Sequence, residues 1–127
     1  MKNLTTAGRF LFAIPFALFG INHFIMYKYY EGMLTSFIPF GAYTIVLTGL
    51  LLIAISISIM TRWYVKQAAY ALAILLLIFI LAIHIPHLVS GEDQSISLIA
   101  LLKDISLMGG SLMIAASSGE KTTDKQP

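Results

Sequence analysis

The sequence predicts an all-α integral membrane protein, a four-helix bundle in one domain. The 127 residues are 58% hydrophobic and only 11% charged, whereas an ordinary soluble domain is about 25% charged. Four stretches are also long and apolar enough to cross a bilayer, since a helical span needs about 20 mostly apolar residues. Lipid offers no hydrogen-bond partners to an open backbone, so each stretch must be a helix.

The spans follow one another along a single domain, 1–117. We place them at about 7–26, 40–60, 67–89 and 96–116. The first span follows Lys2 and Arg9 but has no clear small-residue cleavage site, so we interpret it as a retained helix rather than a signal peptide. The polar segment 118–127 is expected to be a disordered tail.

The basic residues predict the orientation of the spans. With four spans, the N-terminus, the second loop and the C-terminus share one side, which carries Lys2, Arg9, Arg62, Lys66, Lys121 and Lys125. The other side has Lys28, in a tyrosine-rich loop at 27–41 that is expected at the lipid headgroups. Because cytoplasmic loops carry the excess of Lys and Arg, we expect both termini in the cytoplasm.

Composition also excludes several classes of function. Cysteine is absent, which excludes disulfides, thiolate metal sites and dithiol redox chemistry. The net charge of +2 is small and the basic residues are scattered, so no nucleic-acid partner is expected. The lipid bilayer is the expected environment.

Polar and ionisable groups inside a membrane are costly, so each one is a candidate functional residue. Counted at about 1.5 Å per helical residue, the polar groups of three spans converge on the outer half of the bilayer. They are Asn22, His23, His84, His87, Lys103 and Asp104. Their common depth predicts one polar pocket that opens to the outer side.

The segment HIPH places two of these groups on one helix face. His84 and His87 are three residues apart, and residues at this spacing are neighbours on a helix surface. Pro86 lies between them, removes a backbone donor and crowds the carbonyl of Ala82, so it should bend the helix. The structural alternative, strongest for His87, is a histidine at a span end that reaches the headgroups.

The segment LLKD adds a lysine and an aspartate from the fourth span. Lys103 and Asp104 lie about 100° apart around a helix and cannot pair with each other in the i,i+4 manner. We therefore expect Asp104 to pair with His84 or His87, and Lys103 to pair with Asn22 or a loop carbonyl. The alternative interpretation is an internal salt bridge with a structural role only.

Small residues in the fourth span predict close helix packing. Small side chains let membrane helices approach each other. Ser106, Gly109 and Gly110 should therefore pack against the first span at Gly20 or the second at Gly49.

The pattern of spans resembles the DoxX-like family of small four-span bacterial membrane proteins. The resemblance rests on GRFLFAIPFALFGINHF in the first span, the loop ending in FIPFG, VLTGLLLI in the second span and LLKDISLMGGSLMIA in the fourth. The family includes the small subunit of thiosulfate:quinone oxidoreductase and members linked to redox functions. The resemblance thus implies a redox- or quinone-associated subunit of a bacterial inner membrane.

The same resemblance implies partners. The chain has no soluble catalytic domain, so it is not expected to be an enzyme on its own and would need a soluble or membrane redox partner subunit. A homo-oligomer is a further expectation. A related branch of the family is associated with cysteine chemistry, and the absence of cysteine here departs from that branch.

Four interpretations of the predicted pocket stay open. A quinone could take hydrogen bonds from His84, His23 and Lys103, with Asp104 orienting a histidine or relaying a proton. Haem could use His23 and a histidine of the third span, and a metal ion could use His23, His84, His87 and Asp104. A small proton-coupled transporter would depend on Asp104, and a structural subunit would bind no ligand.

Overall fold

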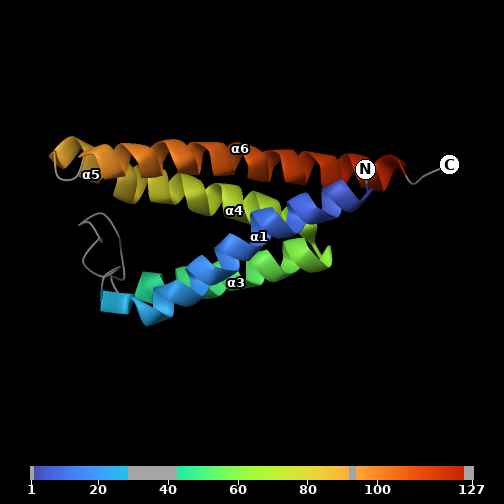
Figure 1. Ribbon diagram of the computed structural model, residues 1–127, viewed down its shortest axis with the longest axis horizontal. Helices are drawn as coiled ribbons and strands as arrows, with labels where there is room; N and C mark the ends of the chain where they lie inside the picture. The colour runs from blue at the N-terminus through green and yellow to red at the C-terminus, as the bar shows by residue number, and fades with distance from the viewer. Residues whose placement is uncertain (1, 29–42, 92–93, 125–127) are drawn as a thin grey trace.

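The computed structural model describes residues 2–28, 43–91 and 94–124 (Figure 1). Its elements in chain order are α1 (Lys2–Ile25), α3 (Tyr43–Thr61), α4 (Val65–Phe79), the π-helix η1 (Ile80–His84), α5 (Ile85–Ser90) and α6 (Gln94–Asp124). The described ranges contain helices and turns and no strands, so the predicted all-α fold is confirmed. Most of the predicted tyrosine-rich loop lies outside the described residues.

Four helical runs in the described ranges are long and apolar enough to cross a membrane. They are Asn3–Ile25, Tyr43–Thr61, Val65–Ser90 and Gln94–Ser118. The runs agree with the four predicted spans, and the third joins α4, η1 and α5 in one continuous helix. Large apolar side chains such as Leu11, Ile74 and Met113 are exposed on the outside of the bundle. An apolar exterior of this kind suits lipid rather than water, which supports a multi-pass membrane protein.

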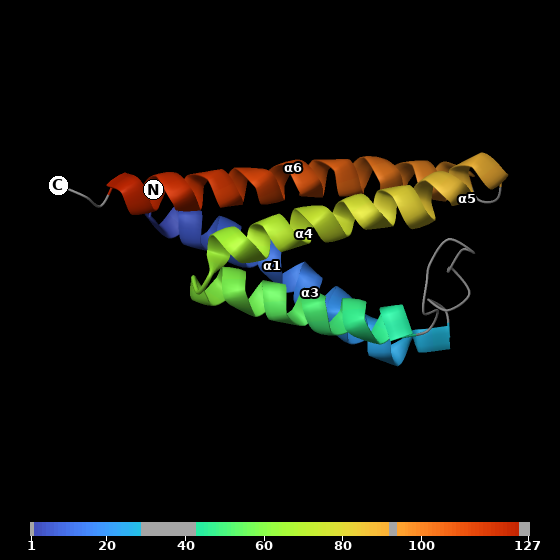
Figure 2. The ribbon, with the colours of Figure 1, turned by 180° about the vertical axis from the view of Figure 1, so that it is seen from behind.

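The helices form two antiparallel pairs, α1 with α3 and α4 with α6 (Figure 1). The pairs lie close together at the end that holds the α3–α4 turn, the start of α1 and the end of α6, and they diverge toward the other end (Figure 2). Helices α1, α3 and α4 supply the apolar core, which contains Ala13, Phe16, Leu52, Ile55, Ile59, Ala68, Leu72, Leu75 and Leu76. The core thus joins the two pairs near the α3–α4 turn.

Two glycines allow the close crossing of α1 and α3. A Cβ atom added at Gly20 would lie 2.8 Å from the carbonyl oxygen of Gly49, and one added at Gly49 would lie 3.0 Å from the carbonyl oxygen of Gly20. Only glycine leaves enough space for the two backbones at this distance. Nearby, the buried Ser56 donates a hydrogen bond from Oγ to the carbonyl of Ala13, over 2.7 Å.

Helix α6 packs against α4 through a face that contains several polar residues. The buried residues of this face are Ser97, Asp104, Ser111 and Ala115. Their separations of seven, seven and four residues are those of one helix face. Ser111 donates a hydrogen bond from Oγ to the carbonyl of Ala69 in α4, over 2.6 Å. The pairing of these two spans thus includes a direct side-chain hydrogen bond.

The predicted packing of the small residues in α6 is wrong for Ser106 and Gly109 and holds in part for Gly110, which contacts the first span. Ser106 and Gly109 are exposed, and a Cβ atom at Gly109 would meet nothing within 4 Å. A Cβ atom at Gly110 would meet the ring of Phe12, at 3.3 Å, rather than Gly20 or Gly49. Ser106 lies about 200° around the helix from Asp104, so it cannot share the face that contacts α4.

The predicted disordered tail, 118–127, is corrected in part. Helix α6 continues to Asp124, so residues 118–124 are helical, and residues 125–127 lie outside the described range. Adding residues to an existing helix avoids the cost of nucleation, which is why polar composition alone does not end a long helix.

Candidate functional site

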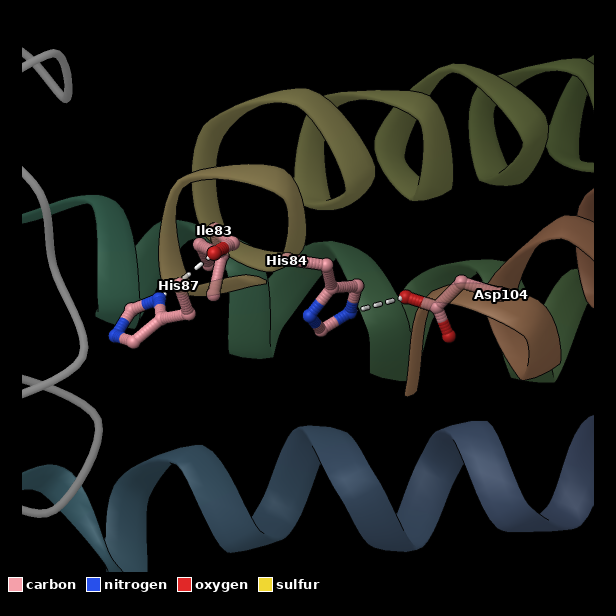
Figure 3. A network of polar contacts seen from close by, with 4 residues as sticks. All are labelled: Ile83, His84, His87 and Asp104. Carbon is pink, nitrogen blue, oxygen red and sulfur yellow. Dashed lines mark hydrogen bonds and ion pairs between the residues drawn. The ribbon is translucent and has the colours of Figure 1, made fainter. Parts of the chain in front are cut away.

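A histidine and an aspartate from two spans meet inside the bundle. His84, the last residue of η1, donates a hydrogen bond from Nε2 to Oδ2 of Asp104 in α6, over 2.8 Å (Figure 3). The two side chains are 15% and 7% exposed, respectively. This is one of the two pairings predicted for Asp104, and the structure confirms it.

The His84–Asp104 pair lies well inside the apolar spans. Asp104 comes ten residues after Gln94, the first residue of α6. At about 1.5 Å per residue it lies about 15 Å along this helix, near the middle of the span Gln94–Ser118. A carboxylate at such a depth is costly unless it has a partner, and the imidazole of His84 provides one.

A π-helical turn positions His84. Five residues, Ile80–His84, form η1, and the N–H of Ile85 donates to the carbonyl of Ile80. Pro86 follows directly in the first turn of α5. A proline ring removes one backbone donor and clashes with the carbonyl four residues earlier, and a wider turn relieves that clash. The bend predicted at Pro86 thus takes the form of a π-helix, a feature that is frequent at functional sites.

The hydrogen bond to Asp104 determines the tautomer of a neutral His84. When Nε2 carries the proton that is donated to the carboxylate, Nδ1 becomes the nitrogen with a free lone pair. Nδ1 points away from Asp104 (Figure 3), and no described residue forms a hydrogen bond with it. A carboxylate that orients an imidazole in this way also stabilises the imidazolium formed after protonation. The pair can therefore accept a proton or a hydrogen bond at Nδ1.

His87 does not take part in this pair. Its Nδ1 donates a hydrogen bond to the carbonyl of Ile83, one turn earlier on the same helix, over 2.7 Å. Its ring points away from the ring of His84 (Figure 3). The alternative pairing of His87 with Asp104 is therefore not formed, and the histidine is bonded to its own helix near the end of the span.

His23 belongs to the other helix pair. It is 5% exposed and donates a hydrogen bond from Nδ1 to the carbonyl of Phe19, over 2.8 Å. The rings of Phe19 and His23 meet edge to face, with 4.9 Å between their centroids. The Cβ atom of His23 lies against Gly49, at the crossing of α1 and α3, and Asn22 is half-buried beside it in α1. His23 therefore lies among packed helix backbones.

Lys103 lies on the outside of α6. Its side chain is exposed, while that of the adjacent Asp104 is buried. The predicted pairing of Lys103 with Asn22 does not agree with this exposure. Because adjacent residues point about 100° apart, only one of the two can face α4. The buried position is occupied by Asp104, whose partner is His84.

The metal-ion alternative is not supported by the geometry. Within residues 2–28, 43–91 and 94–124, no three histidine, aspartate or glutamate side chains come together closely enough to hold a metal ion. His84 and Asp104 meet as a pair, while His23 lies at the α1–α3 crossing. The predicted set of His23, His84, His87 and Asp104 is therefore not assembled.

Two serines contribute polar contacts that were not predicted from the sequence. Ser56 joins α1 to α3 and Ser111 joins α4 to α6 through hydrogen bonds to backbone carbonyls. For Ser111 a signal was present in the sequence, because Ser97, Asp104 and Ser111 repeat at intervals of seven residues. That spacing marks one helix face and places a serine in line with the aspartate.

In comparisons with known proteins, no protein-family model, curated protein or solved structure gives a significant match to this chain.

Proposed function

We propose that this chain is a DoxX-like membrane protein that acts as a redox- or quinone-associated subunit. The observation that supports the proposal is the hydrogen bond between His84 and Asp104 inside the apolar spans. Paired ionisable groups at this depth are typical of proton and ligand sites. In this proposal, Nδ1 of His84 is the atom that meets the quinone head.

The chemistry of a quinone head fits the pair. A quinol hydroxyl can donate a hydrogen bond to the lone pair on Nδ1 of His84, and Asp104 stabilises the imidazolium if the proton is transferred. Conversely, a protonated His84 can donate from Nδ1 to a quinone carbonyl. The chain supplies the binding group and the proton acceptor, and a soluble or membrane redox partner subunit supplies the electron chemistry.

The proposal includes a place in the cell. The chain would be a multi-pass protein of the bacterial inner membrane with both termini in the cytoplasm, as the distribution of basic residues favours. The His84–Asp104 pair would then be reached from the outer leaflet, into which a quinone can partition. A homo-oligomer is compatible with this arrangement and is part of the proposal.

The experiment is a binding titration with a menaquinone analogue. Purified protein in lipid nanodiscs should bind the analogue, and His84→Ala and Asp104→Asn should each weaken binding by roughly 10-fold or more, since a hydrogen bond involving a charged group contributes about 1.5–3 kcal/mol. His87→Ala is the matched control and should bind like the wild type, because His87 is bonded to its own helix. Absence of wild-type binding, or equal binding by all variants, rejects the quinone proposal.

The second candidate function is that of a structural subunit without a ligand. It is favoured by the fact that the same hydrogen bond connects η1 to α6 and so fixes the packing of two spans. Under this alternative, His84→Ala lowers the stability of the protein while no quinone analogue binds. The two candidates are therefore separated by the same titration combined with an unfolding measurement.

A further inference from the structure

The turn between α3 and α4 has a backbone conformation that is unusual for its residues. Helix α3 ends at Thr61 and α4 begins at Val65. The N–H of Trp63 donates to the carbonyl of Ser58 over 3.0 Å, a bond that closes the C-terminus of α3. This arrangement requires a left-handed residue just after the helix, and glycine usually occupies that position. Here the residue is Arg62, with a φ of 66°.

A second left-handed residue follows almost at once. Tyr64 has a φ of 53° and precedes the first residue of α4, and its side chain forms no capping hydrogen bond there. Non-glycine side chains adopt this conformation only at an energetic cost, and bulky side chains do so rarely. Two large side chains therefore occupy positions at which glycine would be favoured by the backbone. Strained positions of this kind point to a role for the side chains themselves.

The side chains of this turn extend away from the bundle. Trp63 is 72% exposed and Tyr64 is 67% exposed. Their rings contact each other edge to face, with 5.6 Å between centroids. Arg62 and Lys66 are also exposed. Two aromatic rings and two cations thus lie together in five residues, at the end of two membrane spans.

We propose that the segment 62–66 is a binding site for the headgroups of anionic phospholipids. Tryptophan and tyrosine prefer the boundary between acyl chains and headgroups, and this places the adjacent cations at the level of the lipid phosphates. Arg62 can form a bidentate hydrogen-bonded pair with a phosphate, and Lys66 adds a second positive charge. The site is separate from the His84–Asp104 pair and does not depend on a quinone function.

The chain provides its own probe for this site, because Trp63 is its single tryptophan. The full-length protein is reconstituted in vesicles that contain either brominated phosphatidylglycerol in unlabelled phosphatidylcholine or the reverse. Bromine quenches tryptophan fluorescence at short range, so the two mixtures report which lipid lies next to Trp63. We expect phosphatidylglycerol to be preferred, with about a fivefold loss of preference for each basic side chain removed near the surface.

The variants test whether the preference comes from this turn. Arg62→Gln with Lys66→Gln should remove most of the preference for phosphatidylglycerol. Lys28→Gln is the control, since it removes one exposed positive charge just after the C-terminus of α1, the end of that helix remote from the α3–α4 turn (Figure 1), and it should leave the preference unchanged. Equal quenching by both lipids in the wild type overturns the proposal. So does a preference that survives the double substitution or that falls equally in the Lys28 variant.

Discussion

Nε2 of His84 and Oδ2 of Asp104 lie 2.8 Å apart and join the third span to the fourth. Both side chains are largely shielded, at 15% and 7% exposed. Removing either partner leaves a buried polar group without its hydrogen bond, and that loss costs more than the net contribution of the bond itself. The pair should therefore behave as one energetic unit.

The first prediction is a measurable coupling between these two residues. His84→Ala and Asp104→Ala should each lower the free energy of unfolding by about 1–3 kcal/mol. The double variant should lose less than the sum, by about 1–2 kcal/mol, because either single change already breaks the shared bond. A double-mutant cycle from reversible unfolding in mixed micelles gives this value.

The residue beside the aspartate serves as the control for that cycle. Lys103 is exposed on the lipid-facing side of α6, so Lys103→Ala removes a charge that is costly in lipid and should leave the stability unchanged or raised. Its effect should add to that of His84→Ala. Strict additivity of the His84 and Asp104 substitutions would show that the bond contributes nothing to stability.

The second prediction concerns the glycine crossing of α1 and α3. Gly20→Ala would place a Cβ atom 2.8 Å from both the Gly49 carbonyl oxygen and the side chain of Ile53. The helices must then separate, which should lower stability by about 1–3 kcal/mol. Gly109→Ala is the matched control, because its Cβ atom would meet nothing within 4 Å, and it should be neutral or slightly stabilising. Equal effects of the two substitutions would contradict the crossing.

The third prediction concerns the serine hydrogen bonds between spans. Ser111→Ala removes the bond to the carbonyl of Ala69, and Ser56→Ala removes the bond to the carbonyl of Ala13. Such bonds contribute about 0.6 kcal/mol on average in membrane proteins, and at most about 1.7 kcal/mol. Losses in this range are expected in the unfolding assay, while Ser106→Ala, on the exposed face of α6, should have no effect.

The sequence predicted the spans well because hydrophobicity over about 20 residues is a strong physical signal. It also predicted the pairing of His84 with Asp104, since a carboxylate inside an apolar helix needs a partner and few partners are available. In both cases a large energetic cost limits the alternatives. The π-helix at Ile80–His84 was predicted only as a bend at Pro86, because several backbone geometries can relieve a proline clash.

The positions of His23 and Lys103 were not predictable for a different reason. The depth of a residue in the bilayer follows from the rise per helical residue. The depth does not determine which other helix packs against that residue. His23 lies at a depth similar to that predicted for His84, yet it packs at the α1–α3 crossing beside Gly49. The prediction for Lys103 is wrong because of the direction of its side chain. Asp104 occupies the face that contacts α4, and the adjacent Lys103 must then point outward.

The fourth prediction concerns orientation, and the absence of cysteine makes it simple to test. Lys66 is exposed near the start of the third span, and Ser95 is exposed near the start of the fourth span. Because these two spans are antiparallel (Figure 1), the two residues lie on opposite sides of the membrane. If basic residues face the cytoplasm, a membrane-impermeant maleimide should label Ser95→Cys in intact cells. It should label Lys66→Cys only after the membrane is permeabilised. The inverse pattern would reverse the proposed orientation.

The fifth prediction separates backbone strain from side-chain function in the turns. Arg62 has a φ of 66° without being glycine, so Arg62→Gly should raise the free energy of unfolding by about 0.5–1 kcal/mol. Gly91, with a φ of 83°, is the reverse case: a Cβ atom there meets nothing within 4 Å, so Gly91→Ala should be destabilising by about 1 kcal/mol through strain alone.

Arg62→Gly and Gly91→Ala should differ in their effect on the preference for phosphatidylglycerol. Arg62→Gly relieves the backbone and also removes a cation beside Trp63, so the more stable protein should lose preference for phosphatidylglycerol in the quenching assay. Gly91→Ala changes stability in the opposite direction and should leave that preference as in the wild type. A stabilised Arg62→Gly protein with an unchanged lipid preference would mean that the strained turn is not maintained for lipid binding.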